Sequence, residues 1–212
     1  MLELWVVRHG QTNWNLEHRV QGWTDIPLNA AGIEEAHALG RYLHGIPFLA
    51  LYTSDLQRAH TTASILQGYT GIPIRVDERL REKRFGALEG QIRHQVQKQK
   101  VVRPHGVSPH VRSDDPEAES NDDLSKRILA FLNDLGNRHQ TGRVLIVTHG
   151  ALIRALLDLS SYREAVSLRN TSVSRIRQHQ SNLHAVHVNW ADHLKQLGQN
   201  HPFQHGTYCA KL

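Results

Sequence analysis

Residues Leu2–Gly10 read LELWVVRHG, and this stretch decides the fold class of the chain. Its first six residues are a short apolar run rich in strand-forming types, which predicts a buried β-strand. An arginine, a histidine and a glycine follow at once, so polar chemistry begins where the apolar run ends. The same order returns later, where the apolar run Val144–Val147 precedes Thr148-His149-Gly150.

The rest of the chain alternates predicted strands with predicted helices. Besides the two strands above, we expect strands at Phe48–Tyr52 and Ile72–Val76 and a hairpin formed by Val173–Gln178 and Leu183–Val188. We expect helices from a cap at Asn29 through His44, from a capping box at Ser54–Gln57 to about Gln67, from Asn121 to about Asn137, and over Ala151–Leu159. This alternation predicts an α/β three-layer sandwich with a mostly parallel central sheet and helices on both faces.

Basic side chains gather after three of the predicted strands. In sheets of this kind ligands bind outside the carboxyl ends of the strands, so we expect one pocket that holds Arg8, His9, Arg58 and His149. Arg58 falls in the first turn of its predicted helix, where backbone N–H groups and the helix dipole attract anions. Two guanidiniums and two imidazoles suit a tetrahedral phosphoryl group, and an imidazole can also attack it as a nucleophile.

Four ordered blocks of sequence resemble the histidine phosphatase superfamily, in particular its phosphoglycerate-mutase-like branch. They are Leu4–Asn15 (LWVVRHGQTNWN), Tyr52–Ala63 (YTSDLQRAHTTA), Leu80–Gly90 (LREKRFGALEG) and Ile146–Leu157 (IVTHGALIRALL). The resemblance extends from residue 2 to about residue 176. Only 67 positions separate Glu82 from His149, and the similar cofactor-dependent mutases carry a longer insertion, so the chain resembles the compact phosphatase group.

The resemblance implies a role for each residue of the expected pocket. His9 would be the nucleophile that takes up the phosphoryl group as phosphohistidine. Arg8, Arg58 and His149 would hold the phosphoryl oxygens and stabilise the charge of the transition state. Glu82 would protonate the leaving alkoxide as a general acid and then deprotonate the attacking water.

Further contacts to the phosphate are implied for Asn15 and, with weaker support, for Gln21, Gly22 and Gly150. The resemblance implies no metal and no cofactor. Attack requires an unprotonated nitrogen on His9, and nearby arginines favour the neutral imidazole. We therefore expect activity to fall at low pH as His9 becomes charged.

Composition narrows the class of protein without naming a ligand. The chain has 212 residues, which favours a single domain over residues 1–212, and 25 Lys and Arg, 16 His and a formal charge of +5 suggest an anionic partner. Basic residues are scattered among acids, which argues against nucleic acid. The single cysteine excludes an internal disulfide framework, and no apolar run approaches the roughly 18 residues of a membrane span. Without a recognisable signal peptide, we expect a cytoplasmic protein.

Residues 86–120 are polar and weakly periodic, and we expect a partly helical insertion beside the pocket that acts as a lid. Its basic residues would contact a second anionic group of the substrate, although a solvated loop explains the composition equally well. The leading function is a phosphatase acting on a small phosphorylated metabolite. A phosphoglycerate mutase and a non-catalytic phospho-ligand binding module stay open as alternatives, as does the choice between monomer and homodimer.

Overall fold

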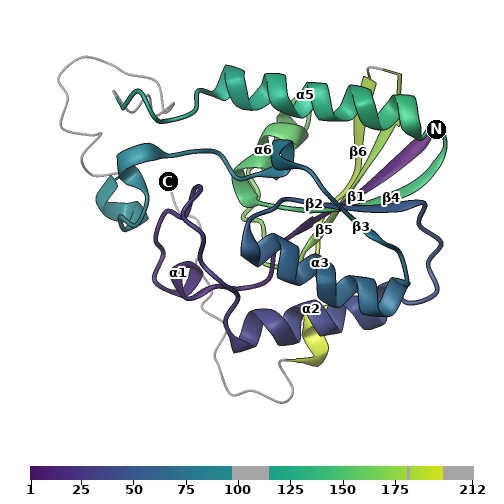
Figure 1. The fold of residues 1–212 in the computed structure, drawn as a ribbon, viewed down its shortest axis with the longest axis horizontal. Coiled ribbons are helices and arrows are strands. Elements are labelled where there is room, and N and C mark those ends of the chain that lie inside the picture. Colours follow the sequence, from purple (N-terminus) through teal and green to yellow (C-terminus); the bar gives the residue numbers. More distant parts are fainter. Residues whose placement is uncertain (97–114, 181, 198–212) are drawn as a thin grey trace.

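A six-stranded sheet forms the centre of the computed structural model, which describes residues 1–96, 115–180 and 182–197 (Figure 1). The strands are β1 (Leu2–Arg8), β2 (Ala50–Thr53), β3 (Ile74–Val76), β4 (Gly142–Thr148), β5 (Val173–His179) and β6 (Asn182–Trp190). They lie in the order β3-β2-β4-β1-β5-β6, and neighbours are parallel from β3 to β1. β5 is antiparallel to β1 and to β6. The mostly parallel sheet and the hairpin are confirmed.

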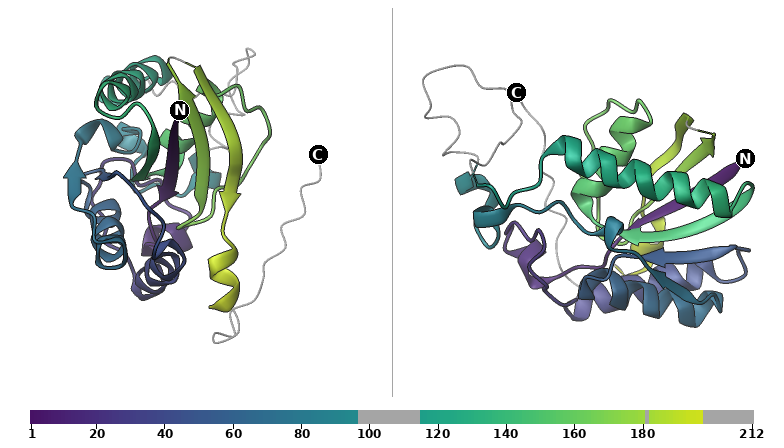
Figure 2. Two further views of the ribbon diagram at one scale, coloured as in Figure 1. Left: turned by 90° about the vertical axis from the view of Figure 1, so that its right-hand side faces the viewer. Right: turned by 45° about the horizontal axis from the view of Figure 1, so that its top comes forward.

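Helices cover both faces of the sheet, as predicted. They are α1 (Asn13–Leu16), α2 (Ala30–Leu43), α3 (Gln57–Thr70), α5 (Asn121–Arg138) and α6 (Gly150–Leu159), with 3-10 turns η1 (Glu78–Leu80), η2 (Gly86–Leu88) and η3 (Asp192–Gln196). In Figure 1, α5 and α6 lie above the sheet and α2 and α3 below it, and Figure 2 shows the same layers from two other sides. None of the described helices is both long and apolar enough to cross a membrane.

The buried strand β1 contributes to both layers of the core. Successive side chains of a strand point to opposite faces, so Leu4 and Val6 pack in the cluster under α5 and α6. Trp5 and Val7 pack on the other side, in the cluster under α2 and α3. A strand buried on both faces needs a nearly continuous apolar run, which explains the composition of this segment.

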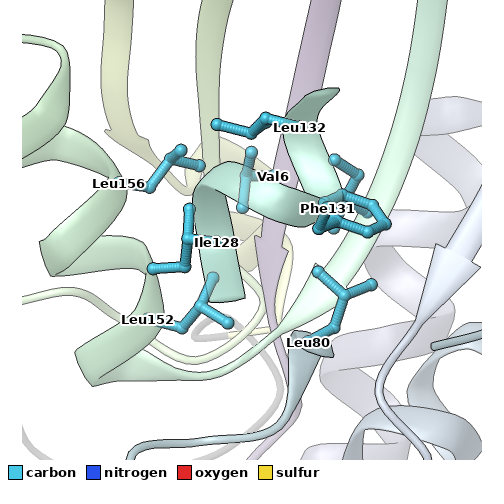
Figure 3. A pocket seen from close by; sticks show the side chains of 8 residues that line it. Val6, Leu80, Ile128, Phe131, Leu132, Leu152 and Leu156 are labelled. Carbon is cyan, nitrogen blue, oxygen red and sulfur yellow. The ribbon is translucent and has the colours of Figure 1, made fainter. Parts of the chain in front are cut away.

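A small apolar cavity lies in the core between β1, α5 and α6 (Figure 3). Its volume is about 10 Å³, and its lining is made of Val6, Leu80, Ile128, Phe131, Leu132, Ile146, Leu152 and Leu156. A space of this size holds about one water molecule, which needs polar partners that these side chains do not offer. The cavity is therefore a small packing defect between the core side chains.

The predicted capping box at the start of α3 is wrong. The helix begins at Gln57, and Leu56 is in the N-cap position. The side chain of Leu56 makes no capping hydrogen bond. Ser54 accepts a hydrogen bond from the Leu56 N–H at 3.2 Å instead. The Gln57 N–H donates to the carboxylate of Asp25 at 2.7 Å, so a distant loop caps the helix.

Most other boundaries differ from the expectation by a few residues. The strand expected at Phe48–Tyr52 begins two residues later, and the one expected at Ile72–Val76 is shorter. The cap of α2 is confirmed, because the side chain of Asn29 accepts a hydrogen bond from the Gly32 N–H at 2.9 Å. The partly helical insertion expected at residues 86–120 is helical at residues 93–96, and residues 97–114 lie outside the described part.

Candidate active site

His9 lies at the carboxyl end of β1 and is 2% exposed. Its backbone N–H donates to the Thr148 carbonyl at 2.9 Å, which ties the end of β1 to the end of β4. Its ring nitrogen Nδ1 lies 2.7 Å from the Gly10 carbonyl oxygen. A carbonyl oxygen only accepts, so Nδ1 carries the proton and Nε2 carries the lone pair. Burial, with the charges of Arg58 and Arg8, lowers the pKa of His9 well below its ordinary value, so the ring is neutral at pH 7.

His149 lies beside His9, with the two ring centroids 5.2 Å apart. It follows β4, precedes the first residue of α6 and is fully buried. Its Nδ1 accepts a hydrogen bond from Arg58 Nε at 3.2 Å, so the proton of the neutral ring is on Nε2. That Nε2 is buried and has no hydrogen-bond partner among the described residues. Burial and the charge of Arg58 lower the pKa of His149 well below its usual range.

Arg58 is fully buried in the first turn of α3, as the sequence predicts. Its Nη2 donates to the Gly22 carbonyl at 2.7 Å and its Nη1 to the Thr24 carbonyl at 2.9 Å. With the bond to His149, these contacts fix the guanidinium in place. Its charge lies against both imidazoles, where it favours an anion and disfavours a proton.

Arg8 enters the site from the last position of β1. Its Nη1 donates to the Leu168 carbonyl at 2.6 Å, whereas its buried Nε has no partner among the described residues. Burial lowers the pKa of Arg8 to about 10, so the side chain remains charged at neutral pH. A β-carbon at Gly150 would lie 3.6 Å from this Nε and 3.8 Å from Glu82 Oε2, so Gly150 lies next to both side chains.

Glu82 follows η1 and is 8% exposed. Its Oε1 accepts hydrogen bonds from the backbone N–H groups of Ala151 at 3.0 Å and of Leu152 at 3.3 Å. These donors are in the first turn of α6, directly after His149. A carboxyl group at a helix N-terminus is favourably placed by the helix dipole. The structure thus brings all five predicted catalytic residues together at one edge of the sheet.

A model of the histidine phosphatase superfamily (branch 1) matches residues 4–191. The chain belongs to the histidine phosphatase superfamily. Phosphoglycerate mutase-like protein 4 of Arabidopsis thaliana is 34% identical over 207 residues, which cover 92% of this chain and 88% of that protein.

Two solved structures extend the comparison to mutases and phosphatases. The phosphoglycerate mutase from Bacillus anthracis str. Sterne has a TM-score of 0.81 and 30% identity, over 92% of this chain and 96% of that chain. The phosphoserine phosphatase mutant H9A from Entamoeba histolytica, in complex with phosphoserine, has a TM-score of 0.76 and 27% identity, over 92% of this chain and 100% of that chain.

The further residues that were predicted to contact phosphate lie in different surroundings in this member of the histidine phosphatase superfamily. Asn15 Oδ1 accepts hydrogen bonds from the Thr12 N–H and hydroxyl, both at 3.1 Å, and the contact of Asn15 to phosphate stays a prediction. Gln21 is buried, and its Oε1 has no partner among the described residues. The carbonyl of Gly22 accepts a hydrogen bond from Arg58. Direct contacts of Gly22 and of Gln21 to phosphate stay predictions.

Sequence reasoning missed Asn170, whose side-chain Nδ2 donates to the His9 carbonyl at 2.9 Å and to Asn15 Oδ1 at 3.2 Å. It lies just before β5, and β5 is antiparallel to β1. The beginning of β5 therefore lies at the edge where the parallel strands end. A search for polar residues before the predicted hairpin would have found it.

Close backbone packing holds the turn after β1. A β-carbon at Gly10 would lie 2.4 Å from the Gly32 carbonyl oxygen, so only glycine fits there. The Gly10 N–H donates to the hydroxyl of Thr62 at 3.0 Å, and that hydroxyl donates to the Arg58 carbonyl at 2.7 Å. Thr62 thus joins the turn that carries His9 to the helix that carries Arg58.

Only the two ends of the predicted insertion 86–120 are described. At its far end, Asp115 accepts a hydrogen bond from the Ala87 N–H at 2.5 Å, and Arg84 pairs with Glu117 at 2.7 Å. The basic residues that were expected to contact a second anionic group are Lys98, Lys100, Arg103, His105, His110 and Arg112, and they lie outside the described residues. The prediction of a lid stays untested.

Proposed function

We propose that this protein is a phosphatase that hydrolyses small phosphomonoesters through a phosphohistidine on His9, without a metal or another cofactor. The observation that carries the proposal is the pair of neighbouring rings of His9 and His149, with centroids 5.2 Å apart. The hydrogen bonds leave a lone pair on His9 Nε2 and an N–H on His149 Nε2 that has no partner among the described residues. The first is a nucleophile and the second a donor for a phosphoryl oxygen. The Nε of Arg8, which has no partner among the described residues, and the charge of Arg58 supply the rest of an anion site.

The first half of the reaction transfers the phosphoryl group to the enzyme. His9 Nε2 attacks phosphorus, and the bond from phosphorus to the leaving oxygen breaks with its electron pair on that oxygen. Glu82 donates a proton to the oxygen, and the product leaves as an alcohol. Arg8, Arg58 and His149 stabilise the charge on the three other oxygens, which is the main task in phosphoryl transfer.

The second half releases phosphate. Glu82 takes a proton from a water molecule while the water oxygen attacks phosphorus. The bond between phosphorus and nitrogen breaks, its electron pair returns to His9 Nε2, and inorganic phosphate leaves. Glu82 accepts hydrogen bonds from the first turn of α6, next to His149, which supports the proposal that one carboxyl group serves both halves.

The test of the proposal is phosphate release from a panel of phosphoglycerates, phosphoserine, sugar phosphates and nucleotides in the presence of EDTA. We expect release by the unaltered protein and loss to background in His9→Ala. His60→Ala is the matched control, because His60 is exposed on α3 and should leave turnover unchanged. Turnover retained by His9→Ala, or abolished by EDTA, would overturn the proposed mechanism.

A mutase is the second candidate, because the Arabidopsis relative and the Bacillus anthracis structure carry mutase names. In a mutase a second hydroxyl of the substrate replaces water as the phosphoryl acceptor. Phosphorus NMR of the reaction with a phosphoglycerate, with and without a bisphosphorylated primer, distinguishes a phosphatase from a mutase. The phosphatase yields inorganic phosphate without primer. Isomerisation that depends on the primer and outpaces hydrolysis would replace the proposal.

A further inference from the structure

One guanidinium donates hydrogen bonds to three backbone carbonyls at and before Glu82. Arg127, on α5, donates from Nη1 to the Arg79 carbonyl at 2.6 Å and to the Arg81 carbonyl at 2.8 Å. Its Nη2 donates to the carbonyl of Glu82 itself at 2.9 Å. Trp23 Nε1 donates to the same Glu82 carbonyl at 2.7 Å.

Arg127 is in turn fixed by a bidentate ion pair with Glu119. The contacts are Nε to Oε1 at 2.6 Å and Nη2 to Oε2 at 2.9 Å. The pair is mostly buried, with 16% of the Arg127 side chain and 12% of the Glu119 side chain exposed. The Glu119 N–H donates to the Arg84 carbonyl at 2.9 Å, so the pair joins α5 to both flanks of Glu82.

We propose that Arg127 is a positioning residue for the carboxyl group of Glu82, an inference that rests on the proposed function. Glu82 is held at two ends: its carbonyl by Arg127 and Trp23, and its carboxyl by the N–H groups at the start of α6. The planar fork of an arginine contacts the three carbonyls and Glu119 at once, which the single ammonium group of a lysine does not match. A shift of the backbone would move the carboxyl group away from the leaving oxygen.

Substrates with different leaving groups separate positioning from a merely structural role. A nitrophenolate leaves without a proton, whereas an alkoxide needs one from Glu82. The ratio of kcat/KM for two substrates does not depend on the fraction of folded protein. In addition, kcat/KM reports the reaction only as far as the formation of phosphohistidine, so the later role of Glu82 as a base does not enter.

The experiment compares kcat/KM for phosphoserine and for p-nitrophenyl phosphate in Arg127→Lys, Trp23→Phe and Glu82→Gln. We expect Arg127→Lys to lower the value for phosphoserine by about 10- to 100-fold and that for p-nitrophenyl phosphate by less than about threefold, since general acid catalysis contributes about 10²- to 10⁴-fold. Trp23→Phe should change the ratio in the same direction by a smaller factor.

Arg79→Lys is the matched control, because the Arg79 side chain forms its ion pairs with Asp77 and with Asp134 of α5. It should leave the ratio unchanged. Equal losses for both substrates in Arg127→Lys, or a change of ratio in the control as large as in Arg127→Lys, would overturn the inference. If Glu82→Gln itself lowers kcat/KM equally for both substrates, Glu82 is not the general acid. The positioning role of Arg127 is then refuted as well.

Discussion

His9 and His149 lie with ring centroids 5.2 Å apart and carry their protons on opposite ring nitrogens. The hydrogen-bond partner of each Nδ1 atom decides which ring nitrogen carries the proton. The Gly10 carbonyl can only accept, so His9 keeps its proton on Nδ1, and the Arg58 guanidinium can only donate, so His149 keeps its proton on Nε2. One ring therefore offers an electron pair and the other an N–H before any substrate binds.

Replacing His149 should remove a donor to the phosphoryl group while leaving the nucleophile. We expect His149→Asn to lower kcat by about 10²- to 10³-fold, the cost of one donor to an oxyanion. Rapid quenching should show slower formation of phosphohistidine on His9. A variant with nearly normal kcat would contradict the role of His149 as a donor.

The titration of His9 should occur at a pH well below that of a free histidine. Burial and the charges of Arg58 and Arg8 lower its pKa, so the neutral nucleophile should persist as the pH falls below 6.5. NMR of the His9 ring carbons measures this directly, with a histidine peptide that titrates near 6.5 as reference. A phosphate ester has its own pKa near 6, which is why a rate profile alone is a poorer measure. Titration of His9 at or above 6.5 would refute the expectation.

Global stability should decrease as the pH falls below 6.5. The pKa values of His9 and His149 are lowered in the folded state, so below 6.5 the unfolded chain binds protons that the folded chain does not. The free energy of unfolding should fall by up to about 1.4 kcal/mol per pH unit for each of the two histidines. Urea unfolding between pH 7.5 and 5 measures this slope.

The double variant His9→Gln/His149→Gln should reduce that slope, because it removes two of the buried groups whose pKa values are lowered by folding. His60→Gln is the control, since this exposed residue on α3 should leave the slope unchanged. An equal slope in the double variant and the unaltered protein would show that other groups cause the acid sensitivity.

Adding one methyl group at position 10 should destabilise the protein. In Gly10→Ala the new β-carbon meets the Gly32 carbonyl oxygen at 2.4 Å. That oxygen belongs to the backbone and the backbone also fixes the position of a β-carbon, so neither atom can rotate away. We expect a loss of about 1–3 kcal/mol in thermal or urea unfolding, together with reduced activity, because the turn carries His9.

Gly68→Ala is the matched control for this substitution. Gly68 lies in α3, and a β-carbon there meets no atom within 4 Å. Alanine at a helix interior should stabilise the protein by about 0.5–1 kcal/mol. Equal effects of the two substitutions would show that close packing at Gly10 is unimportant.

Asn170→Ala should impair catalysis more than folding. The substitution removes the bonds to the His9 carbonyl and to Asn15 Oδ1, so the turn after β1 and the side chain of Asn15 lose a common support. We expect a fall in kcat of about tenfold, equivalent to about 1.4 kcal/mol. Asn137→Ala, at an exposed position of α5, should change neither kcat nor stability. Equal kcat values for the two variants would count against a role for Asn170.

The sequence alone was sufficient for features that depend on neighbouring residues. The apolar run of β1 and the cap of α2 by Asn29 follow from patterns within a few positions. The convergence of Arg8, His9 and His149 follows from one general rule, that parallel strands end at the same edge of a sheet. Glu82 has no such local pattern, and only the family resemblance indicated it.

Other features arise from contacts between segments far apart in the chain, which no local pattern records. Asp25 caps α3 in place of Ser54, because folding brings a loop 32 positions away to the start of the helix. Asn170 reaches His9 because β5 is antiparallel, so its beginning lies at the active edge.

The protonation of His9 and His149 also depends on contacts that form only in the folded chain. LELWVVRHG and the later Thr-His-Gly determined that two histidines would meet at one edge of a parallel sheet. Only the tertiary structure decided which nitrogen of each ring carries the proton, because that depends on the group that folding places against it. For His149 this group is Arg58, 91 positions away.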